Sequence, residues 1–381
     1  MKVLILSNST LPRIGGMEIA THNLAEGLVE CGQSVAIMTS TPQTCAYKKN
    51  YDIINYAQPR GFTRLKLEGY FAALKLIQVN SVLKPDIIHA NLFYPSGYGA
   101  ILAKKILKKP VVITSHGGDI LSVPKINYGY RLDKNLASKI IKAVNHADGV
   151  IAISQKIYQE YVKLQNNEIP IEYIPNGINY SYISTIIEKN TKSYEQPRIL
   201  LVGRNHPVKG YRELLSHLPR LLRKYNNLKV FIIGDNVTKL RDLIPDEFVN
   251  QVLLFESVSP IGIEIEGMNS EKLIELYKEA TIFAMPSYSE GLPVSMIEAM
   301  SFGLPIVATR AAGRDLVEQN VNGLLVETGN FKAFVDTLEE LLLDTDLQKR
   351  FVKASQAKGC EFNRKTIAQK HISFYERLIK G

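Results

Sequence analysis

Short apolar runs alternate along the chain with longer segments in which apolar residues recur every three or four positions. Runs that are apolar throughout are typical of parallel strands covered on both faces by helices. In the first half, the pattern predicts strands at Lys2–Leu6, Ser34–Thr39, Asp86–His89, Val111–Thr114 and Gly149–Ile153, and helices over Gly16–Cys31 and Gly97–Leu107. The first half therefore has the pattern of an α/β domain.

The second half repeats this alternation. The predicted strands are Arg198–Val202, Lys229–Ile233, Thr281–Met285, Ile306–Ala308 and Leu324–Val326. The predicted helices are Tyr211–Lys224, Ser270–Glu279, Pro293–Ser301 and, with an interruption near Gly359, Lys332–Gly381. Between the halves, Pro175-Asn176-Gly177-Ile178 and the polar residues 179–196 have the composition of a turn and a linker.

This pattern predicts an α/β fold of two Rossmann-like, doubly wound domains that face each other across an interdomain cleft. The domains are residues 1–178 and residues 179–364, and a last helix, about 365–381, is expected to pack back on the first domain. Ligands of such sheets bind beyond the carboxyl ends of the strands. Binding residues are therefore expected in the turns that follow the strands.

Composition narrows the class of protein. With 381 residues, 45% hydrophobic and 22% charged, the chain has the size of two globular domains. The apolar run at residues 3–6 is too short for a signal peptide, and no run approaches the roughly 18 residues of a spanning helix. A cytoplasmic location is therefore expected. Three cysteines without CxxC spacing predict neither a disulfide framework nor a zinc site.

Positive charge is concentrated in the first half of the chain. Residues 1–178 hold 20 Lys and Arg against 12 Asp and Glu, whereas the remainder holds 26 against 25. This asymmetry indicates an anionic partner, which could be a phosphorylated small molecule or a membrane surface. Nucleic acid is not expected, because the sequence has no helix-turn-helix, zinc knuckle or aromatic RNA platform.

Two turns of the first half are candidates for ligand contacts. Gly15 and Gly16 open the first helix without the GxGxxG spacing of a dinucleotide site, and adjacent glycines let backbone N–H groups approach a phosphate. A glycine-rich turn without a ligand is the alternative. His116 follows a strand and precedes Gly117-Gly118-Asp119, where an imidazole can reach a substrate hydroxyl. A capped surface turn is the alternative there.

In the second half, Gly203-Arg204 and Lys209-Gly210 lie on one loop after a strand, so both cations could close on a diphosphate. Solvated loop charges are the alternative.

The segment 286–300 is the strongest signal. Pro293 suits the first turn of a helix, so that Glu290 lies in the loop before it and Glu298 on it, while Gly291 and Leu292 offer N–H groups at the helix start. Eight helical residues span about 12 Å, which exceeds the roughly 5 to 9.5 Å of a glycosidase carboxylate pair. The two carboxylates are therefore expected to bind a sugar and a ribose, the alternative being acids stabilised by the helix dipole.

Two basic segments of the first half resemble membrane-surface helices. Lys104, Lys105, Lys108 and Lys109 fall on one side of a predicted helix, with Leu102, Ala103, Ile106 and Leu107 on the other. Residues 60–79 place Arg60, Arg64, Lys66 and Lys75 among apolar residues. Such segments can rest on anionic headgroups, although solvated helices would have the same pattern.

The E-x7-E pattern of Glu290 and Glu298 resembles the retaining family 4 glycosyltransferases of the GT-B fold. The similarity extends over most of the chain, through Gly303-Leu304-Pro305, Asn322-Gly323-Leu324 and Pro175-Asn176-Gly177. It implies an N-terminal acceptor-binding domain and a C-terminal domain that binds a nucleotide-sugar, with His116, Glu290, Arg204 and Lys209 as catalytic residues. It also implies a set of donor-binding residues: Gly15, Gly16, Gly203, Arg204, Lys209, Glu290, Gly291, Leu292, Pro293 and Glu298.

The resemblance implies sugar transfer from a nucleotide diphosphate, with UDP expected, to an acceptor such as a lipid-linked saccharide in polysaccharide or glycan assembly. A nucleotide-sugar epimerase and a noncatalytic sugar-nucleotide-binding module are the alternatives. The loose segment Ser257–Asn269 departs from the family pattern and leaves the nucleotide open. Asp344-Thr345-Asp346 is expected to cap a helix, so neither a metal nor another cofactor is predicted.

Overall fold

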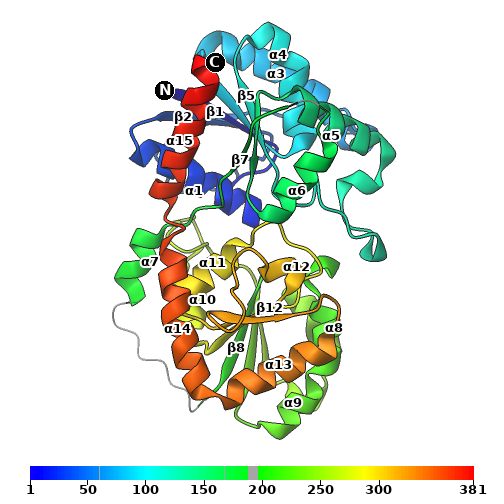
Figure 1. Ribbon diagram of the computed structural model, residues 1–381, viewed down its shortest axis with the longest axis vertical. Coiled ribbons are helices and arrows are strands. Elements are labelled where there is room, and N and C mark those ends of the chain that lie inside the picture. Colours follow the sequence, from blue (N-terminus) through cyan, green and yellow to red (C-terminus); the bar gives the residue numbers. More distant parts are fainter. Residues whose placement is uncertain (60, 167, 188–195) are drawn as a thin grey trace. The chain divides into compact units, whose positions relative to one another are not determined.

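The computed structural model describes residues 1–59, 61–166, 168–187 and 196–381. The chain divides into two compact units, of which the first is Met1–Gly177 with Arg364–Gly381 and the second is Ile178–Asn363 (Figure 1). These limits lie one residue from the boundaries expected from the sequence.

The first unit is built on a seven-stranded parallel sheet with the strand order β3-β2-β1-β4-β5-β6-β7. The strands are β1 (Lys2–Ser7), β2 (Ser34–Thr39), β3 (Asp52–Asn55), β4 (Ile87–Asn91), β5 (Val111–Thr114), β6 (Gly149–Ala152) and β7 (Ile171–Tyr173). The strand order reverses between β1 and β4, where Ser7 pairs with Asn91. Such a switch point is where doubly wound sheets bind ligands.

The helices of the first unit include one from the end of the chain. They are α1 (Gly16–Glu30), α2 (Phe62–Leu65), α3 (Glu68–Leu83), α4 (Tyr98–Leu107), α5 (Lys134–His146), α6 (Gln155–Leu164) and α15 (Arg364–Lys380). Figure 1 shows α15, in red, beside α1, in blue, and the two helices pack against each other. The last helix thus completes the first unit.

The second unit has a six-stranded parallel sheet with the order β10-β9-β8-β11-β12-β13. Its strands are β8 (Arg198–Val202), β9 (Lys229–Ile233), β10 (Val252–Phe255), β11 (Ile282–Met285), β12 (Ile306–Thr309) and β13 (Gly323–Val326). Its helices are α7 (Tyr180–Ile187), α8 (Tyr211–His217), α9 (Pro219–Lys224), α10 (Glu271–Glu279), α11 (Val294–Ser301), α12 (Arg310–Gly313), α13 (Phe331–Leu343) and α14 (Thr345–Cys360). Each unit is therefore a Rossmann-like α/β fold, as predicted.

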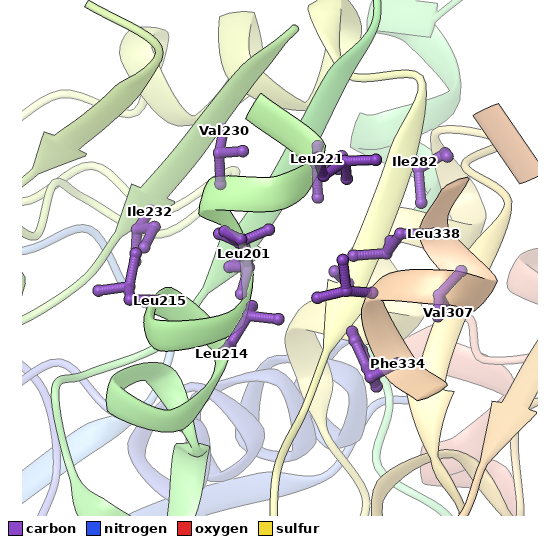
Figure 2. Packing of buried hydrophobic residues seen from close by; sticks show 14 of the residues in the cluster. Leu201, Leu214, Leu215, Leu221, Val230, Ile232, Ile282, Val307, Phe334 and Leu338 are labelled. Atoms are coloured by element: carbon purple, nitrogen blue, oxygen red, sulfur yellow. The ribbon is translucent and has the colours of Figure 1, made fainter. Parts of the chain in front are cut away.

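The core of the second unit holds its loops in place. Figure 2 shows Leu201 and Ile232 of the sheet packed with Leu214 of α8 and Phe334 of α13, all within one buried cluster. Full burial of a leucine or phenylalanine side chain contributes about 1.5–3 kcal/mol. The loops at the carboxyl ends of β8 and β11 therefore start from well-fixed strands.

Several elements differ from the sequence pattern. Pro219 divides the predicted helix Tyr211–Lys224 into α8 and α9, because proline cannot continue the hydrogen bonding of a helix interior. The segment expected as a linker contains α7, and residues 188–195 lie outside the described residues. Helix α14 continues through Gly359 and ends at Cys360, so the expected interruption comes slightly later.

Candidate functional site

In the second unit, the loop after β8 is shaped by a glycine. Gly203 follows Val202, the last residue of β8, with φ +152°, a conformation that other residues rarely adopt. A Cβ atom at this position would lie 3.0 Å from Cε and 3.2 Å from Nζ of Lys209. The absence of a side chain at Gly203 therefore gives Lys209 room to cross the carboxyl end of the strand.

Two loops meet so that Lys209 reaches Glu290. The backbone N–H of Tyr288 donates to the carbonyl oxygen of Val208 at 2.7 Å. Gly210, with φ +67°, approaches the other loop so closely that a Cβ there would lie 2.6 Å from the carbonyl oxygen of Pro286. As a result, Nζ of Lys209 lies 2.8 Å from Oε1 of Glu290, and each side chain is 15% exposed. The structure thus brings together two residues that lie 81 positions apart.

Other polar groups surround this ion pair. Arg204 is exposed, and no hydrogen bond or ion pair holds its guanidinium within the described part of the chain. His206 accepts a hydrogen bond from the Val208 N–H at Nδ1, 3.2 Å away, which leaves the proton of the neutral ring on Nε2. Burial, followed by the charges of Arg204 and Lys209, lowers the pKa of His206. This loop therefore combines two cations with a neutral imidazole.

Glu298 lies in α11 and has a separate partner. Its carboxylate is buried and accepts a hydrogen bond from the hydroxyl of Tyr277 at 3.0 Å. Burial raises the pKa of Glu298 to about 7, although the Tyr277 hydrogen bond lowers it. The two glutamates of the E-x7-E pattern are therefore in different environments, because Glu290 faces a lysine and Glu298 a phenol.

The residues between the glutamates lead into α11. Gly291 has no hydrogen bond to its N–H among the described residues, whereas Leu292 is buried. The helix begins at Val294, so Pro293 is its N-cap instead of its first residue. Its extended backbone accounts for the difference of one position.

In the first unit, α1 begins at Gly16 as expected, and its first turn contains a carboxylate that the sequence analysis did not consider. A Cβ at Gly15 would meet a carboxylate oxygen of Glu18 at 2.4 Å, whereas a Cβ at Gly16 would meet nothing within 4 Å. Glu18 is 8% exposed and accepts a hydrogen bond from the Ser9 hydroxyl at 2.5 Å. The space at Gly16 is open to a ligand, but Glu18 already places a negative charge at this helix N-terminus.

His116 lies on a loop that is fixed by buried hydrogen bonds. The Asp119 carboxylate accepts from the Ser115 hydroxyl at 2.5 Å and from the Phe93 N–H at 2.7 Å. Nε2 of His116 lies 3.3 Å from Oδ1 of Asn91, at the end of β4. Burial, followed by the charge of His371, lowers the pKa of His116 to about 4. His116 is therefore neutral at neutral pH.

A cavity of about 20 Å³, with room for one water molecule, lies next to His116 within the first unit. Its polar lining consists of Thr21, His89, Asn91, Thr114, His116, Asn176 and His371. The ring of His89 is held between two buried hydroxyls, those of Thr114 and Tyr375. It nevertheless lines the same cavity as His116.

The described residues contain no group of three or more His, Cys, Asp or Glu placed to hold a metal ion. Asp344 caps α14 by accepting a hydrogen bond from the Leu347 N–H at 2.8 Å, as expected from the sequence. Within the described ranges, no helix is both long and apolar enough to span a bilayer.

Both halves of the chain match known families of one enzyme class. Residues 14–182 match Glycosyltransferase Family 4, and residues 183–358 match Glycosyl transferases group 1. The chain belongs to the family 4 glycosyltransferases of the GT-B fold. It is therefore a glycosyltransferase, a class that binds a nucleotide-sugar donor and an acceptor.

Individual relatives cover nearly the whole glycosyltransferase chain. An uncharacterised glycosyltransferase of Methanocaldococcus jannaschii is 26% identical over 398 residues, covering 99% of this chain and 98% of that protein. The N,N'-diacetylbacillosaminyl-diphospho-undecaprenol alpha-1,3-N-acetylgalactosaminyltransferase of Campylobacter jejuni is 27% identical over 333 residues, covering 78% and 84%. The crystal structure of Anabaena HepE in complex with UDP shares the fold, with a TM-score of 0.74 and 20% identity over 99% and 100% of the chains.

The predicted site residues of this glycosyltransferase form two groups, one in each unit. In the second unit, Gly203, Lys209 and Glu290 come together, Arg204 lies on the same loop, and Glu298 is bonded elsewhere. In the first unit, His116 and the start of α1 at Gly16 are surrounded by polar residues that sequence reasoning missed. Those residues are Glu18, Thr21, Asn91 and His371, and in the second unit Tyr277 was missed. Of these residues, only Asn91 lies at the end of a strand, where its position could have indicated it, and the others are single polar residues within helices.

Proposed function

We propose that this glycosyltransferase transfers a sugar from a UDP-sugar to a lipid-linked saccharide and releases UDP, with retention of the anomeric configuration, in the assembly of a cell-surface polysaccharide or glycan. The observation that carries the proposal is the Lys209–Glu290 pair at the carboxyl end of the second sheet. Lys209 offers a cation for a phosphate, and Glu290 offers a carboxylate for sugar hydroxyls. The two groups are in direct contact with each other. Two comparisons support the choice of acceptor and donor. The name of the Campylobacter relative contains a saccharide linked to diphospho-undecaprenol, and the crystal structure of HepE contains UDP.

Each charged group has a role in donor binding. Lys209 has three N–H donors, so it can hold Glu290 and a phosphate oxygen at the same time. Arg204 supplies a planar fork for the other phosphate. Glu290 then accepts hydrogen bonds from the donor sugar, next to the N–H of Gly291, and Glu298 accepts from the ribose hydroxyls.

In the first unit, His116 contacts the transferred sugar, and Gly15 and Gly16 let the backbone approach the phosphate. The open space above Gly16 supports the phosphate contact, whereas the Glu18 carboxylate opposes it electrostatically. No metal and no further cofactor take part in this proposal.

The proposed reaction needs no covalent intermediate on the protein. The bond between the anomeric carbon and the phosphate oxygen breaks, and the acceptor oxygen bonds to that carbon from the same face. The proton of the acceptor hydroxyl passes to the departing diphosphate. Arg204 and Lys209 stabilise the charge that develops on this leaving group.

Thermal shifts with UDP, ADP and GDP, followed by product analysis with UDP-sugars, test the donor. UDP should raise the melting temperature most, because a ligand that binds only the folded state stabilises it. Stabilisation by ADP or GDP without UDP would contradict the choice of nucleotide.

Incubation with a UDP-sugar and a lipid-linked saccharide tests the reaction. The expected product carries the sugar with the anomeric configuration of the donor, as read by NMR, and UDP is released. An inverted product would contradict retention, and transfer only to free sugars would contradict the acceptor. Conversion of the donor without an acceptor would indicate an epimerase, and binding without UDP release a noncatalytic module.

We also propose that a face of the first unit rests on an anionic membrane surface. On α3, Leu74 follows Tyr70 by four positions and Val82 follows Leu74 by eight, so the three side chains lie on one side of the helix, and they are 45%, 66% and 85% exposed. Helix α4 packs against α3 and exposes Ile106, which the sequence analysis had placed on its apolar side. Several large apolar side chains thus face solvent on neighbouring helices.

The charge around these side chains matches an anionic partner. Residues 61–109 hold eight Lys and Arg against two carboxylates, and both carboxylates are occupied inside the unit. Glu68 accepts from the Tyr94 hydroxyl, and Asp86 accepts from the Lys2 backbone N–H, each at 2.6 Å. Lys108 lies beyond the end of α4, so the predicted single helical row of lysines is wrong, and Arg60 lies outside the described residues.

Sedimentation with vesicles tests this surface. The protein should bind phosphatidylglycerol vesicles more strongly than phosphatidylcholine vesicles, and added salt should weaken the binding. Changing Leu74 and Val82 together to serine should reduce it, whereas Leu343→Ser, at a 65% exposed position of α13, serves as the matched control. Equal binding of the double variant and the wild type would contradict the proposal.

A further inference from the structure

Two hydrogen bonds connect His116 to the first helix, and a third lies within that helix. Nε2 of His116 lies 3.3 Å from Oδ1 of Asn91, and Nδ2 of Asn91 lies 2.7 Å from Oγ1 of Thr21. The Thr21 hydroxyl in turn donates to the carbonyl oxygen of Met17 at 2.7 Å. Asn91 is 1% exposed and Thr21 is 2% exposed, so water does not compete for these groups. This series of residues is called the Met17–Thr21–Asn91–His116 relay below.

The direction of the relay follows from its first member. A carbonyl oxygen can only accept, so the Thr21 hydroxyl points its hydrogen at Met17 and offers its oxygen to Asn91. The Asn91 group facing Thr21 is therefore the amide NH2, which turns Oδ1 toward His116. An acceptor in that position requires a proton on Nε2 of His116. The neutral imidazole then has an unprotonated Nδ1, and this atom has no hydrogen bond among the described residues.

The surroundings keep the imidazole neutral. The titratable groups near His116 are His89 on β4, His371 on α15 and Asp119 on its own loop. His371 donates from Nδ1 to the carbonyl oxygen of Ile367 at 3.0 Å, and burial lowers its pKa to about 4. The charge of Asp119 is taken up by the hydroxyl and N–H groups that hold the loop. Among the described residues, no carboxylate is therefore left to favour an imidazolium.

The loop that bears His116 is also fixed from the other side. The Ser115 N–H donates to the Tyr161 hydroxyl at 3.0 Å, and this hydroxyl donates to the Ile151 carbonyl oxygen at 3.1 Å. The backbone of His116 is therefore held in place without Asn91. What Asn91 adds is control of the ring and its tautomer.

We propose that Asn91 is a positioning residue that holds His116 as the Nε2–H tautomer, so that Nδ1 accepts a hydrogen bond from a hydroxyl of the transferred sugar. This inference rests on the proposed role of His116 in contacting that sugar. It adds a determinant of specificity, because an acceptor at Nδ1 selects a sugar with a hydroxyl at that position over the corresponding deoxy sugar.

The tautomer can be measured without any substrate. In ¹⁵N-histidine NMR spectra of the full-length protein at neutral pH, the signals lost in His116→Gln identify the His116 ring. The expected result is a protonated Nε2 and an unprotonated Nδ1, with a mixture of tautomers in Asn91→Leu. Asn91→Asp keeps an acceptor toward His116 and should keep a proton on Nε2, while its carboxylate raises the pKa of the imidazole. A protonated Nδ1 in the wild type would mean that the relay runs in the opposite direction and would overturn the proposal.

Kinetics with a turned-over UDP-sugar give the second readout. Asn91→Leu should lower kcat about tenfold, the effect of losing one hydrogen bond, with little change in the KM of the donor. Its preference for the hydroxylated sugar over the deoxy sugar should fall by a similar factor. Unchanged kcat and unchanged preference in Asn91→Leu would overturn the proposal.

Two further variants separate positioning from folding. Asn23→Leu is the matched control, because Asn23 is a buried asparagine of α1 that lies outside the relay and whose Oδ1 accepts no hydrogen bond from the described part of the chain. Thr21→Val removes the hydroxyl at nearly constant size and should shift the His116 tautomer even if Asn91→Leu fails to fold. If the wild type transfers no sugar, the proposed function fails, while the wild-type NMR spectrum still decides the direction of the relay.

Discussion

In the second unit a lysine and a glutamate meet as full charges, whereas in the first unit buried imidazoles, an amide and hydroxyls meet as neutral groups. The Lys209–Glu290 pair is 15% exposed on each side, so water and salt still reach it. In the His116 relay, Asn91 and Thr21 are 1% and 2% exposed, and burial lowers the pKa values of both His116 and His371 to about 4. Because a buried charge is unfavourable without a partner, the drier site uses directed hydrogen bonds and the wetter one uses charge.

This contrast fits two different ligands. A diphosphate carries charge and is held by cations, whereas a sugar is neutral and is held by hydrogen bonds of defined direction. The second unit is therefore suited to the nucleotide part of a donor, and the relay of the first unit to a sugar hydroxyl. Removing charges from one site and directed hydrogen bonds from the other should give different signatures.

The largest effect is expected from the cations of the second unit. Lys209→Ala should lower kcat/KM at least about 100-fold, because it removes the group that we propose to stabilise the leaving diphosphate and leaves Glu290 without its partner. Arg204→Ala should also lower transfer sharply. Steady-state kinetics at two salt concentrations measure both effects, since added salt should weaken donor binding to the wild type more than to Lys209→Ala.

Lys332→Ala is the control for these variants, because Lys332 is an exposed lysine of the same unit on α13. Near-normal turnover in both Lys209→Ala and Arg204→Ala would contradict the proposal that this loop binds the diphosphate of the donor.

A smaller effect is expected from Glu298→Gln. At pH 8 this variant should bind UDP more weakly than the wild type but should be more stable against unfolding. The ionised carboxylate should accept ribose hydroxyls, so UDP affinity of the wild type should rise between pH 6 and pH 8, and the variant should bind roughly tenfold more weakly at pH 8. Titration calorimetry at both pH values measures this. Unchanged affinity in the variant would place the ribose elsewhere.

Stability of the protein without nucleotide should show the reverse. The pKa of Glu298 is raised from 4.5 to about 7 in the folded state, so its contribution to stability is fully present below pH 4.5 and is lost as the pH rises through 7. The loss amounts to about 3 kcal/mol. Glu298→Gln should therefore be more stable than the wild type at pH 8, as measured by urea unfolding, whereas a less stable variant at pH 8 would contradict the buried carboxyl.

The smallest effect on donor binding is expected from a substitution at Gly16. Substitutions at Gly16 and Gly210 should also differ sharply in their effect on the stability of the protein. Gly210→Ala should destabilise the protein by about 1–3 kcal/mol, because φ is +67° and the new Cβ would approach the Pro286 carbonyl oxygen. Gly16→Ala should fold normally, since nothing lies within 4 Å, and should lower donor affinity a few-fold if a phosphate approaches there. Thermal unfolding and donor titration of both variants measure these effects. Unchanged donor affinity in Gly16→Ala would contradict the proposal that a phosphate binds at the start of α1.

Much of the fold could be predicted because its central strands are continuous apolar runs. Edge strands such as β3 (Asp-Ile-Ile-Asn) and β7 (Ile-Glu-Tyr) could not, since they are half exposed and too short to show a pattern. Helices α5 and α6 were also missed, although Asp133 and Ser154 cap their N-termini. Those caps are signals that a closer inspection of the sequence could have used.

The candidate sites differ in the same way. Lys209 and Glu290 belong to compact segments rich in glycine and proline, where spacing alone suggests a loop at the end of a strand. Thr21, Asn91 and His371 are single polar residues from a helix, a strand end and the last helix, and only tertiary packing brings them together. No local pattern marks such residues, because the hydrogen bonds that define them join positions 25 and 70 residues apart.

The return of α15 to the first unit bears on the order in which the protein is made. Helix α15 packs on α1, and its residues Ile367 and His371 line the cavity beside His116. Residues 1–177 therefore emerge from the ribosome long before the helix that completes their cavity, with all of the second unit translated in between. Until α15 has been made, the first unit lacks one wall of the cavity beside His116, so the nascent chain cannot complete the surroundings of His116 before the second unit has been made.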